Sequence, residues 1–423
     1  MQKWINETDL LSYPEISDIE IKTALKFSVE QMVRNIYSFK GNFPGAASFD
    51  GFYKPGVNKG WTTGFFTGET WLSYENASFV AGERIGADGK LRENPEGASE
   101  RTLQDVKDFF SYAAERQVLS FLSRIERKAD VDHHDMGFLY SPSCVAAWKL
   151  RDDENGRKAA LLAADQLISR FQPVGEFIQA WGRMGAPENY RFIIDCLLNL
   201  PLLYWATGET GDPKYRDIAE KHIHTAMANV IREDDSTWHT VFMNPKTGKF
   251  DHGATCQGYK DGSAWARGQA WGVYGTAVAY KYTKRPEYFS YFKRVTGYFL
   301  HHLPKDLVPY WDLTFGDGDD EPRDSSSAVI AACGMLEMAK YLSQEEAAYY
   351  TSIARKLLKA LYDACRVTDP EESNGLLLHG TYSKKSPYNT CTPEGVDECV
   401  IWGDYYWMEA LNRLYNPSWQ IYW

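Results

Sequence analysis

One helical pattern recurs along the chain and constrains its fold more than any other feature. An apolar, aromatic-rich helix end is followed by a short polar turn and then by a long amphipathic helix. The pattern starts at Trp148, Tyr204, Tyr280 and Ala339, so that successive starts lie 56, 76 and 59 residues apart. A unit of that length holds two helices with their loops. Such helical hairpins must stack on one another to bury their apolar faces.

The same pattern extends into the N-terminal part of the chain. The stretch "IEIKTALKFSVEQMVRNIYSF" predicts an opening helix, and a diverged hairpin follows "WLSYE" at Trp71, where residues of about 79–104 resemble an insertion. Six hairpins fit 423 residues, which is the number that closes an (α/α)6 barrel. We therefore predict an all-α fold with residues 1–423 in a single (α/α)6 domain. The periodicity alone is also compatible with an open solenoid.

Charge and composition argue against several classes of partner. The formal net charge of −11 disfavours nucleic acid and anionic membranes, although a local arginine could still bind a small anion. The first residues have no signal-peptide core, and no run of 18 or more apolar residues occurs. The seven cysteines form no CxxC pair, which is typical of reduced thiols. We expect a cytoplasmic protein, either a monomer or a dimer.

Motifs for metals and cofactors are missing from the sequence. It contains no HExxH motif, no Cys/His quartet, no P-loop, no dinucleotide glycine fingerprint and no G-x-S-x-G elbow. His133 and His134 are adjacent, so their side chains should diverge rather than share one ion. We expect neither a catalytic metal nor a cofactor.

The loops before the apolar helices are instead rich in Gly, Trp, His and acidic residues. In a closed barrel these loops would surround the central funnel, where we expect the functional residues to lie. Tryptophan rings can stack on sugar faces, although a large core alone would absorb many of them. Arg267 stands between two such rings and could clamp a carboxylate in bidentate fashion, or could form a buried ion pair.

Acid chemistry is the strongest remaining signal, and Asp195 is its best candidate. It lies in "NYRFIIDCLLNLPLLYWATGETGD", which we interpret as one apolar helix, kinked where Pro201 deprives the Leu197 carbonyl of its usual partner. Burial raises the pKa of a carboxyl, so Asp195 could serve as a general acid. The alternative is a structural pairing with a buried Arg or His. Asp135 in "HHDMGF" is the second acid, and its alternative role is a helix N-cap.

Five motifs together resemble the unsaturated glucuronyl hydrolases, glycoside hydrolase family 88: "WTTGFFTG", "VDHHDMGFLYSPS", "IIDCLLNLPLLYWA", "CQGYKDGSAWARGQAWGVYG" and "RDSSSAVIAACG". The resemblance runs from about residue 20 to 415 and leaves out the insertion near 79–104. It implies an (α/α)6 barrel. It also implies hydrolysis of the unsaturated uronic acid at the non-reducing end of lyase-generated glycosaminoglycan oligosaccharides, through hydration of the C4=C5 vinyl ether.

The resemblance also implies roles for particular residues. Asp195 would be the acid/base and Asp135 its assistant, while Arg267 would be a partner for the uronate carboxylate. Ser383 and Ser386 belong to a loop that binds sulfate in some members as Ser-x-x-Ser-x-Lys, but Tyr388 stands here in place of the lysine. The full set of expected substrate-binding residues is Trp61, His134, Trp181, His239, Gln257, Trp265, Arg267, Trp271, Ser383 and Ser386.

Two other functions compete with this interpretation. The first is an unsaturated rhamnogalacturonyl hydrolase acting on pectin fragments, a related activity that "HHDMGF" and "SAWARGQAWGVYG" disfavour. The second is a helical toroid that binds uronides without turning them over. The presence of both Asp135 and Asp195 argues against that second alternative.

Overall fold

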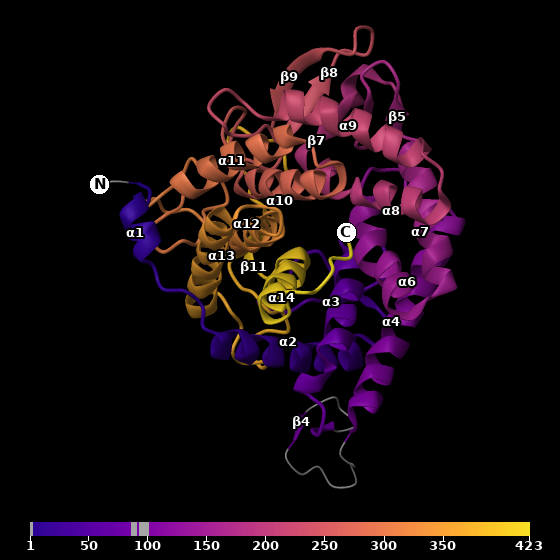
Figure 1. Ribbon diagram of the computed structural model, residues 1–423, viewed down its shortest axis with the longest axis vertical. Coiled ribbons are helices and arrows are strands. Elements are labelled where there is room, and N and C mark those ends of the chain that lie inside the picture. The colour runs from indigo at the N-terminus through magenta and orange to yellow at the C-terminus, as the bar shows by residue number, and fades with distance from the viewer. Residues whose placement is uncertain (1–2, 86–90, 93–100) are drawn as a thin grey trace.

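The computed structural model describes residues 3–85, 91–92 and 101–423, and its helices form two concentric rings (Figure 1). Helix α1 (Glu7–Ser12) precedes the rings. Among the described residues, the inner ring consists of α3 (Thr63–Glu75), the continuous segment α5–η2–α6 (Met136–Tyr140, Ser141–Val145, Ala146–Arg151), α8 (Pro201–Thr210), α10 (Ala266–Thr283), α12 (Ser325–Ala339) and α14 (Ile401–Tyr415). The outer ring consists of α2 (Asp18–Phe39), α4 (Leu103–Glu126), α7 (Glu154–Ile168), α9 (Lys214–Val230), α11 (Pro286–His301) and α13 (Gln344–Ala364).

The inner ring is closed, which rules out the open solenoid. Each inner helix packs against the next along the chain, and α14 packs against both α12 and α3. The four recurring hairpins appear as an inner helix followed by an outer one: α6–α7, α8–α9, α10–α11 and α12–α13. The diverged hairpin predicted at Trp71 corresponds to α3 and α4. The predicted opening helix is α2. The prediction of an all-α (α/α)6 barrel is confirmed.

Burial differs between the two rings as the sequence pattern requires. All residues of α12 from Ser325 to Met338 are buried, because this helix meets neighbours on every side. The outer helix α13 buries one face only, with Ile353, Leu357 and Leu361 among its buried residues. In the described part of the chain, no helix combines the length and the apolar character that crossing a bilayer would need.

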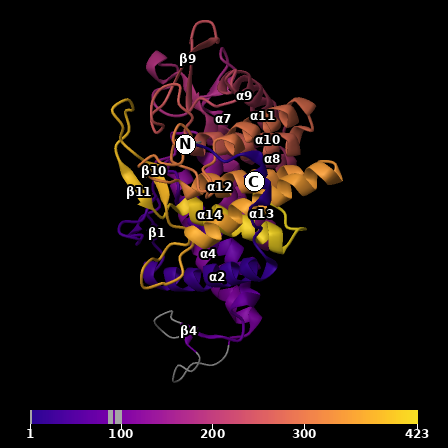
Figure 2. The same ribbon diagram turned by 90° about the vertical axis from the view of Figure 1, so that its left-hand side faces the viewer.

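Short strands and long loops lie at one end of the ring, before the inner helices begin. In Figure 2, β1, β9, β10 and β11 lie on the same side of the helices. The strands pair antiparallel as β1 (Phe43–Pro44) with β2 (Pro55–Gly56), β5 (Phe171–Gln172) with β6 (Phe177–Ile178), β10 (Gly380–Ser383) with β11 (Glu394–Glu398), and β7 (Arg191–Ile193) with β8 (Thr240–Met243) and β9 (Phe250–Ala254) in one sheet.

The segment around Asp195 differs from the prediction of a single kinked helix. Its first residues form β7, a 3-10 turn (η4, Ile194–Leu198) follows, and α8 begins only at Pro201. Pairing of β7 with β8 holds the first part extended. Pro201 then starts a helix rather than kinking one, because its fixed φ and missing N–H suit the first helical turn. The prediction was therefore wrong for residues 189–200.

The predicted insertion at about 79–104 is only partly described. Helix α3 ends at Glu75, β3 (Arg84–Ile85) pairs antiparallel with β4 (Leu91–Arg92), and α4 starts at Leu103. Residues 86–90 and 93–100 lie outside the described residues. The assignment of this segment as an insertion in a single domain stays a prediction.

Candidate active site

A cavity of about 460 Å³ opens among the loops that precede the inner helices. All the predicted site residues line it except Ser386. The residues that line it are Trp61, His134, Asp135, Trp181, Ile193, Asp195, His239, Cys256, Gln257, Trp265, Arg267, Trp271, Tyr382, Ser383, Thr390, Cys391, Thr392 and Glu394. The barrel therefore gathers residues from five separate inter-helical loops into one site.

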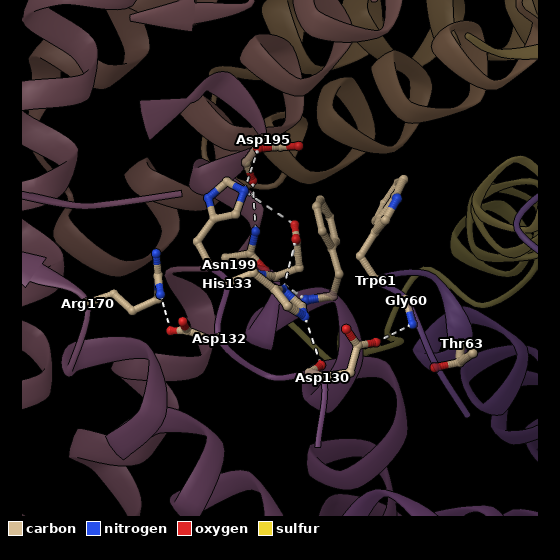
Figure 3. Close-up of polar contacts among 12 residues, drawn as sticks. Gly60, Trp61, Thr63, Asp130, Asp132, His133, Arg170, Asp195 and Asn199 are labelled. Carbon is tan, nitrogen blue, oxygen red and sulfur yellow. Dashed lines mark hydrogen bonds and ion pairs between the residues drawn. The ribbon is translucent and has the colours of Figure 1, made fainter. Parts of the chain in front are cut away.

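The two candidate acids come from segments that pack backbone to backbone. Asn199 donates a hydrogen bond to the Asp195 carbonyl (3.3 Å), and its side-chain oxygen accepts one from the Phe138 N–H (2.9 Å) (Figure 3). Gly137 permits this contact, because a Cβ at that position would lie 2.3 Å from the Cα of Asn199. One asparagine and one glycine thus fix the position of Asp135 relative to Asp195.

Asp135 occupies the N-cap position of α5, but its side chain makes no capping bond. Its carboxylate instead lies beside two imidazoles: His133 Nδ1 is 3.0 Å from Oδ2, and His134 Nε2 is 3.4 Å from Oδ1. The same Nε2 is 3.5 Å from Asp195 Oδ1 (Figure 3). The two histidines therefore reach different oxygens of one carboxylate, and His134 bridges the two acids.

The pKa values of the two acids are shifted in opposite directions. Burial raises the pKa of Asp195 well above its ordinary value, the negative charge of Asp135 raises it further, and Arg267 acts in the opposite direction. Burial also opposes ionisation of Asp135, but the imidazoles of His134 and His133 outweigh it, so the pKa of Asp135 lies below its ordinary value. Burial lowers the pKa of His134 to about 4. A proton in this pair therefore favours Asp195 over Asp135.

The Asp195 side chain is placed where it could exchange a proton with a molecule in the cavity. Its side chain is 17% exposed, on the wall of the cavity, and its Oδ1 is a buried atom without a hydrogen-bond partner among the described residues. A protonated carboxyl that faces a cavity and has no protein acceptor can act as a general acid. Its conjugate base can then accept a proton from water.

His239 presents a neutral donor to the cavity. Its Nδ1 accepts hydrogen bonds from the Cys256 N–H (2.9 Å) and the Gln257 N–H (3.4 Å), so the ring proton is left on Nε2. Burial lowers the pKa of His239 to about 3, and the charges of Arg267 and Arg191 lower it in the same direction. The ring can therefore bind a hydroxyl of a ligand without carrying a charge.

Arg267 forms the buried ion pair that was one of its two predicted roles. Its Nη1 lies 3.2 Å from Asp324 Oδ2 and donates to the Thr381 carbonyl (2.7 Å), while Nη2 donates to the Tyr382 carbonyl (2.7 Å). Trp265 flanks the guanidinium with its ring centroid 4.4 Å away. Arg267 thus holds strand β10 against the cavity, and only Nε is a buried donor without a partner among the described residues. Its pairing with a ligand carboxylate stays a prediction.

Tryptophans form much of the cavity wall, and other residues hold them in place. Trp61 donates its indole N–H to the Tyr382 hydroxyl (2.9 Å) and stacks on Trp402 at a centroid distance of 5.0 Å. Trp181 is 39% exposed, and the guanidinium of Arg191 lies 4.8 Å from its ring centroid. Rings held in this way are preorganised for stacking on a sugar.

The predicted sulfate loop has a different internal arrangement. Ser383 lines the cavity, but its hydroxyl donates to the Thr392 carbonyl (2.6 Å). Ser386 lies outside the lining, where its hydroxyl donates to the Tyr259 carbonyl (2.5 Å) and accepts from two backbone N–H groups of the loop. Lys384 pairs with Glu321. Both serine hydroxyls therefore support the loop, and the assignment of Ser386 to substrate binding receives no support from the geometry.

Several cavity residues were missed in the sequence. Tyr382 directly precedes Ser383 in the sequence. Asn199, which supports the site from outside the cavity lining, follows Asp195 by four residues in "IIDCLLNLPLLYWA". Ile193 and Cys256 are the first residues of two recognised motifs, "IIDCLLNLPLLYWA" and "CQGYKDGSAWARGQAWGVYG", but were not assigned to the site. No sequence pattern marked the hairpin residues Thr390, Cys391, Thr392 and Glu394, because only the folded loops bring them to the cavity.

An (α/α)6 barrel with two buried acids and several tryptophans around one cavity is typical of a carbohydrate-active enzyme. The sequence model described as Glycosyl Hydrolase Family 88 matches residues 98–414. The chain belongs to this family of glycoside hydrolases. The resemblance read from the motifs is confirmed.

Individual relatives match over nearly the whole chain. The unsaturated chondroitin disaccharide hydrolase of Streptococcus pneumoniae is 44% identical over 415 residues, which is 98% of this chain and 96% of the relative. The crystal structure of the unsaturated glucuronyl hydrolase from Streptococcus agalactiae superposes with a TM-score of 0.87 at 40% identity, over 100% of this chain and 98% of that one. An aspartate-to-asparagine mutant of the latter, complexed with dGlcA-GalNAc6S, superposes with a TM-score of 0.81 at 36% identity, over 100% and 98% of the two chains.

Proposed function

We propose that the protein removes the unsaturated 4-deoxy-Δ4 uronic acid from the non-reducing end of lyase-generated glycosaminoglycan oligosaccharides. The observation that carries the proposal is the buried pair of Asp195, whose pKa is raised, and Asp135, whose pKa is lowered, in a tryptophan-lined cavity. The names of the relatives and the disaccharide bound to one of them support the same substrate class. Unsaturated disaccharides and longer oligosaccharides are the proposed partners.

The proposed chemistry begins with proton transfer to carbon. Asp195 gives its proton to C4 of the C4=C5 bond, and the ring oxygen stabilises the positive charge that develops at C5. Water then adds to C5 and loses a proton to the Asp195 carboxylate, which restores the acid. The resulting hemiketal at C5 opens, and the second sugar leaves from C1. Asp135 stays ionised and stabilises the positive charge.

This route explains why one acid serves two steps. The anomeric carbon is not attacked, so the separation of the two carboxylates does not report a retaining or inverting outcome. What matters is a single group that is protonated at rest and basic after donation. His239 Nε2 and the side-chain oxygen of Gln257 are the proposed contacts for sugar hydroxyls or for the attacking water, since both line the cavity.

Loss of ultraviolet absorbance from the conjugated C4=C5 bond tests the proposal directly. We expect turnover of unsaturated chondroitin and hyaluronan disaccharides and none of unsaturated rhamnogalacturonan. Turnover restricted to the pectin-derived substrate would replace the proposal with the rhamnogalacturonyl activity. Binding of every substrate without loss of absorbance would identify a non-catalytic toroid.

The cellular context of the proposal follows from the thiols. All seven cysteines are free, and six of them are buried. This pattern supports a reducing compartment, and we propose that the enzyme lies in the cytoplasm. We also propose that it is a monomer or a dimer. Oligosaccharides made outside the cell would then have to be imported before hydrolysis.

A further inference from the structure

Three side chains in the cavity have their potential ligand atoms turned toward one another. His134 Nε2, a carboxylate oxygen of Asp135 and one of Asp195 all lie within 4.8 Å of each other. His134 is 1% exposed, and neither of its ring nitrogens has a hydrogen-bond partner in the described part of the chain. Asp195 Oδ1 is also buried without one. Buried polar atoms without partners require a physical explanation.

The distances within this trio do not suit hydrogen bonds. His134 Nε2 lies 3.4 Å from Asp135 Oδ1 and 3.5 Å from Asp195 Oδ1. Good N–H···O bonds span about 2.7–3.2 Å. Zinc binds nitrogen and oxygen ligands at about 2.0–2.2 Å, which places tetrahedral ligand atoms about 3.3–3.6 Å apart. These two separations match edges of such a polyhedron, and the third pair of ligand atoms, on Asp135 and Asp195, lies within 4.8 Å.

The surroundings also suit a dication. The second oxygen of Asp135 is held by His133 at 3.0 Å, which fixes the carboxylate and leaves Oδ1 facing His134. The nearby Arg267 is neutralised by its ion pair with Asp324. The open cavity can supply a water or a sugar oxygen as the fourth ligand.

We propose that His134, Asp135 and Asp195 form an inhibitory binding site for a borderline divalent metal ion such as Zn²⁺. The ion is not a cofactor of the reaction. It occupies the carboxylate oxygens that proton transfer to and from Asp195 would use, and it competes with the sugar for the floor of the cavity. A site with one nitrogen and two oxygen ligands favours Zn²⁺ over Mg²⁺ or Ca²⁺, which need more oxygen ligands.

Isothermal titration of the full chain, cleared of metal with EDTA, tests the site without any substrate. We expect one Zn²⁺ per chain with micromolar affinity, and at least 100-fold weaker binding of Mg²⁺. Asp195→Asn and His134→Gln should each weaken Zn²⁺ binding at least tenfold while leaving the melting temperature of the metal-free protein within a few degrees of wild type. Zn²⁺ should also inhibit turnover competitively with the disaccharide, and EDTA should restore it.

An exposed His–Asp pair elsewhere provides the matched control. His379 Nδ1 lies 2.7 Å from Asp397 Oδ1, far from the trio in sequence, and both residues are outside the cavity lining. His379→Gln should leave Zn²⁺ affinity and inhibition unchanged. Zn²⁺ binding that survives in both Asp195→Asn and His134→Gln, or that disappears in His379→Gln, would overturn the proposal. So would inhibition that saturating disaccharide does not relieve.

Discussion

Asp195 and Asp135 show how two identical side chains acquire opposite pKa shifts from their neighbours. Asp195 is buried and lies near the like charge of Asp135, and its Oδ1 has no hydrogen-bond donor in the described part of the chain, so its neutral form is favoured. Asp135 lies between two imidazoles and is favoured as an anion. The direction of each pKa shift is thus set by contacts of a few ångströms rather than by residue type.

Replacing Asp195 with Asn should remove nearly all turnover while keeping the fold. Asn is close to Asp in shape but cannot donate or accept the catalytic proton, and general acid–base catalysis is typically worth about 10²–10⁴-fold. The melting temperature should stay level or rise, because the carboxyl is held in a buried site at an energetic cost. Asp251→Asn, an exposed change on β9, is the control. A variant within tenfold of wild type in the ultraviolet assay would remove Asp195 from the catalytic role.

Arg267→Ala should damage stability as well as binding. Breaking a buried ion pair from one side typically costs about 3–5 kcal/mol, because Asp324 is left uncompensated. We also expect Arg267→Ala to raise the Kd for the uncleaved disaccharide more than Asp135→Asn does. Both changes are compared in an Asp195→Asn background. Adding Asp324→Asn should recover part of the melting temperature but none of the affinity. Unchanged affinity without Arg267 would show that another group holds the uronate carboxylate.

At the scale of elements, the site depends on how closely two loop-to-helix junctions approach. The start of α5 and the turn η4 touch at Gly137 and Asn199, and Asn199 bonds to both. The two acids sit directly beside these contacts, at positions 135 and 195. Small changes in the packing of the two junctions therefore translate into changes of the distance between acid and partner.

Gly137→Ala should lower kcat strongly while lowering the melting temperature only slightly. A Cβ would lie 2.3 Å from the backbone of Asn199. The two backbone segments can relieve this clash only by moving apart. Misplacement of a catalytic group by about 1 Å can cost on the order of 10²-fold in rate. Gly297→Ala on the outer helix α11 is the control, since a Cβ there meets nothing within 4 Å and helix propensity favours alanine. Equal activity of the two variants would show that the junction tolerates displacement.

Some elements could be predicted from the sequence, and others could not. The hairpins were predictable because amphipathic periodicity is local to each pair of helices. The segment before Pro201 was not, since a short buried strand and a 3-10 turn share the apolar composition of a helix. The partners of Arg267 come from residues 324 and 381–382, and no local pattern connects them to it. Most cavity residues were still found, because their motifs are long and specific to the family.

The whole molecule depends on one seam, where the first inner helix meets the last. Helix α3 packs against α14, and Asn76 donates to the Asn412 side chain across this contact at 3.0 Å. Beside it, Glu69 and Asp404 are both fully buried acids that interact electrostatically, and Tyr53 donates to Asp404 at 2.9 Å. The seam is therefore the part of the ring whose stability should respond to pH.

From the buried carboxyl of Asp404 we predict that the folded protein loses stability as pH rises toward neutrality. Burial raises its pKa from 3.8 to about 7, so between these values the folded chain holds a proton that the unfolded chain has lost. The stabilisation is complete below pH 3.8 and disappears as pH rises through 7, with a slope of about 1.4 kcal/mol per pH unit between them. The melting-temperature difference between wild type and Asp404→Asn should fall steadily from pH 5 to 7 and then level off. Parallel curves would assign the group an ordinary pKa.

The seam also bears on the order of events when the chain folds. Asn76 and Asn412 are 336 residues apart, so the ring closes only after most of the chain has been synthesised. Individual hairpins are local and can form early, whereas closure carries the entropic cost of a very long loop and gives the fold a high contact order. Trp61 needs Tyr382 and Trp402 to complete its side of the cavity. Activity should therefore appear in the last kinetic phase of refolding, later than most of the helical signal in circular dichroism.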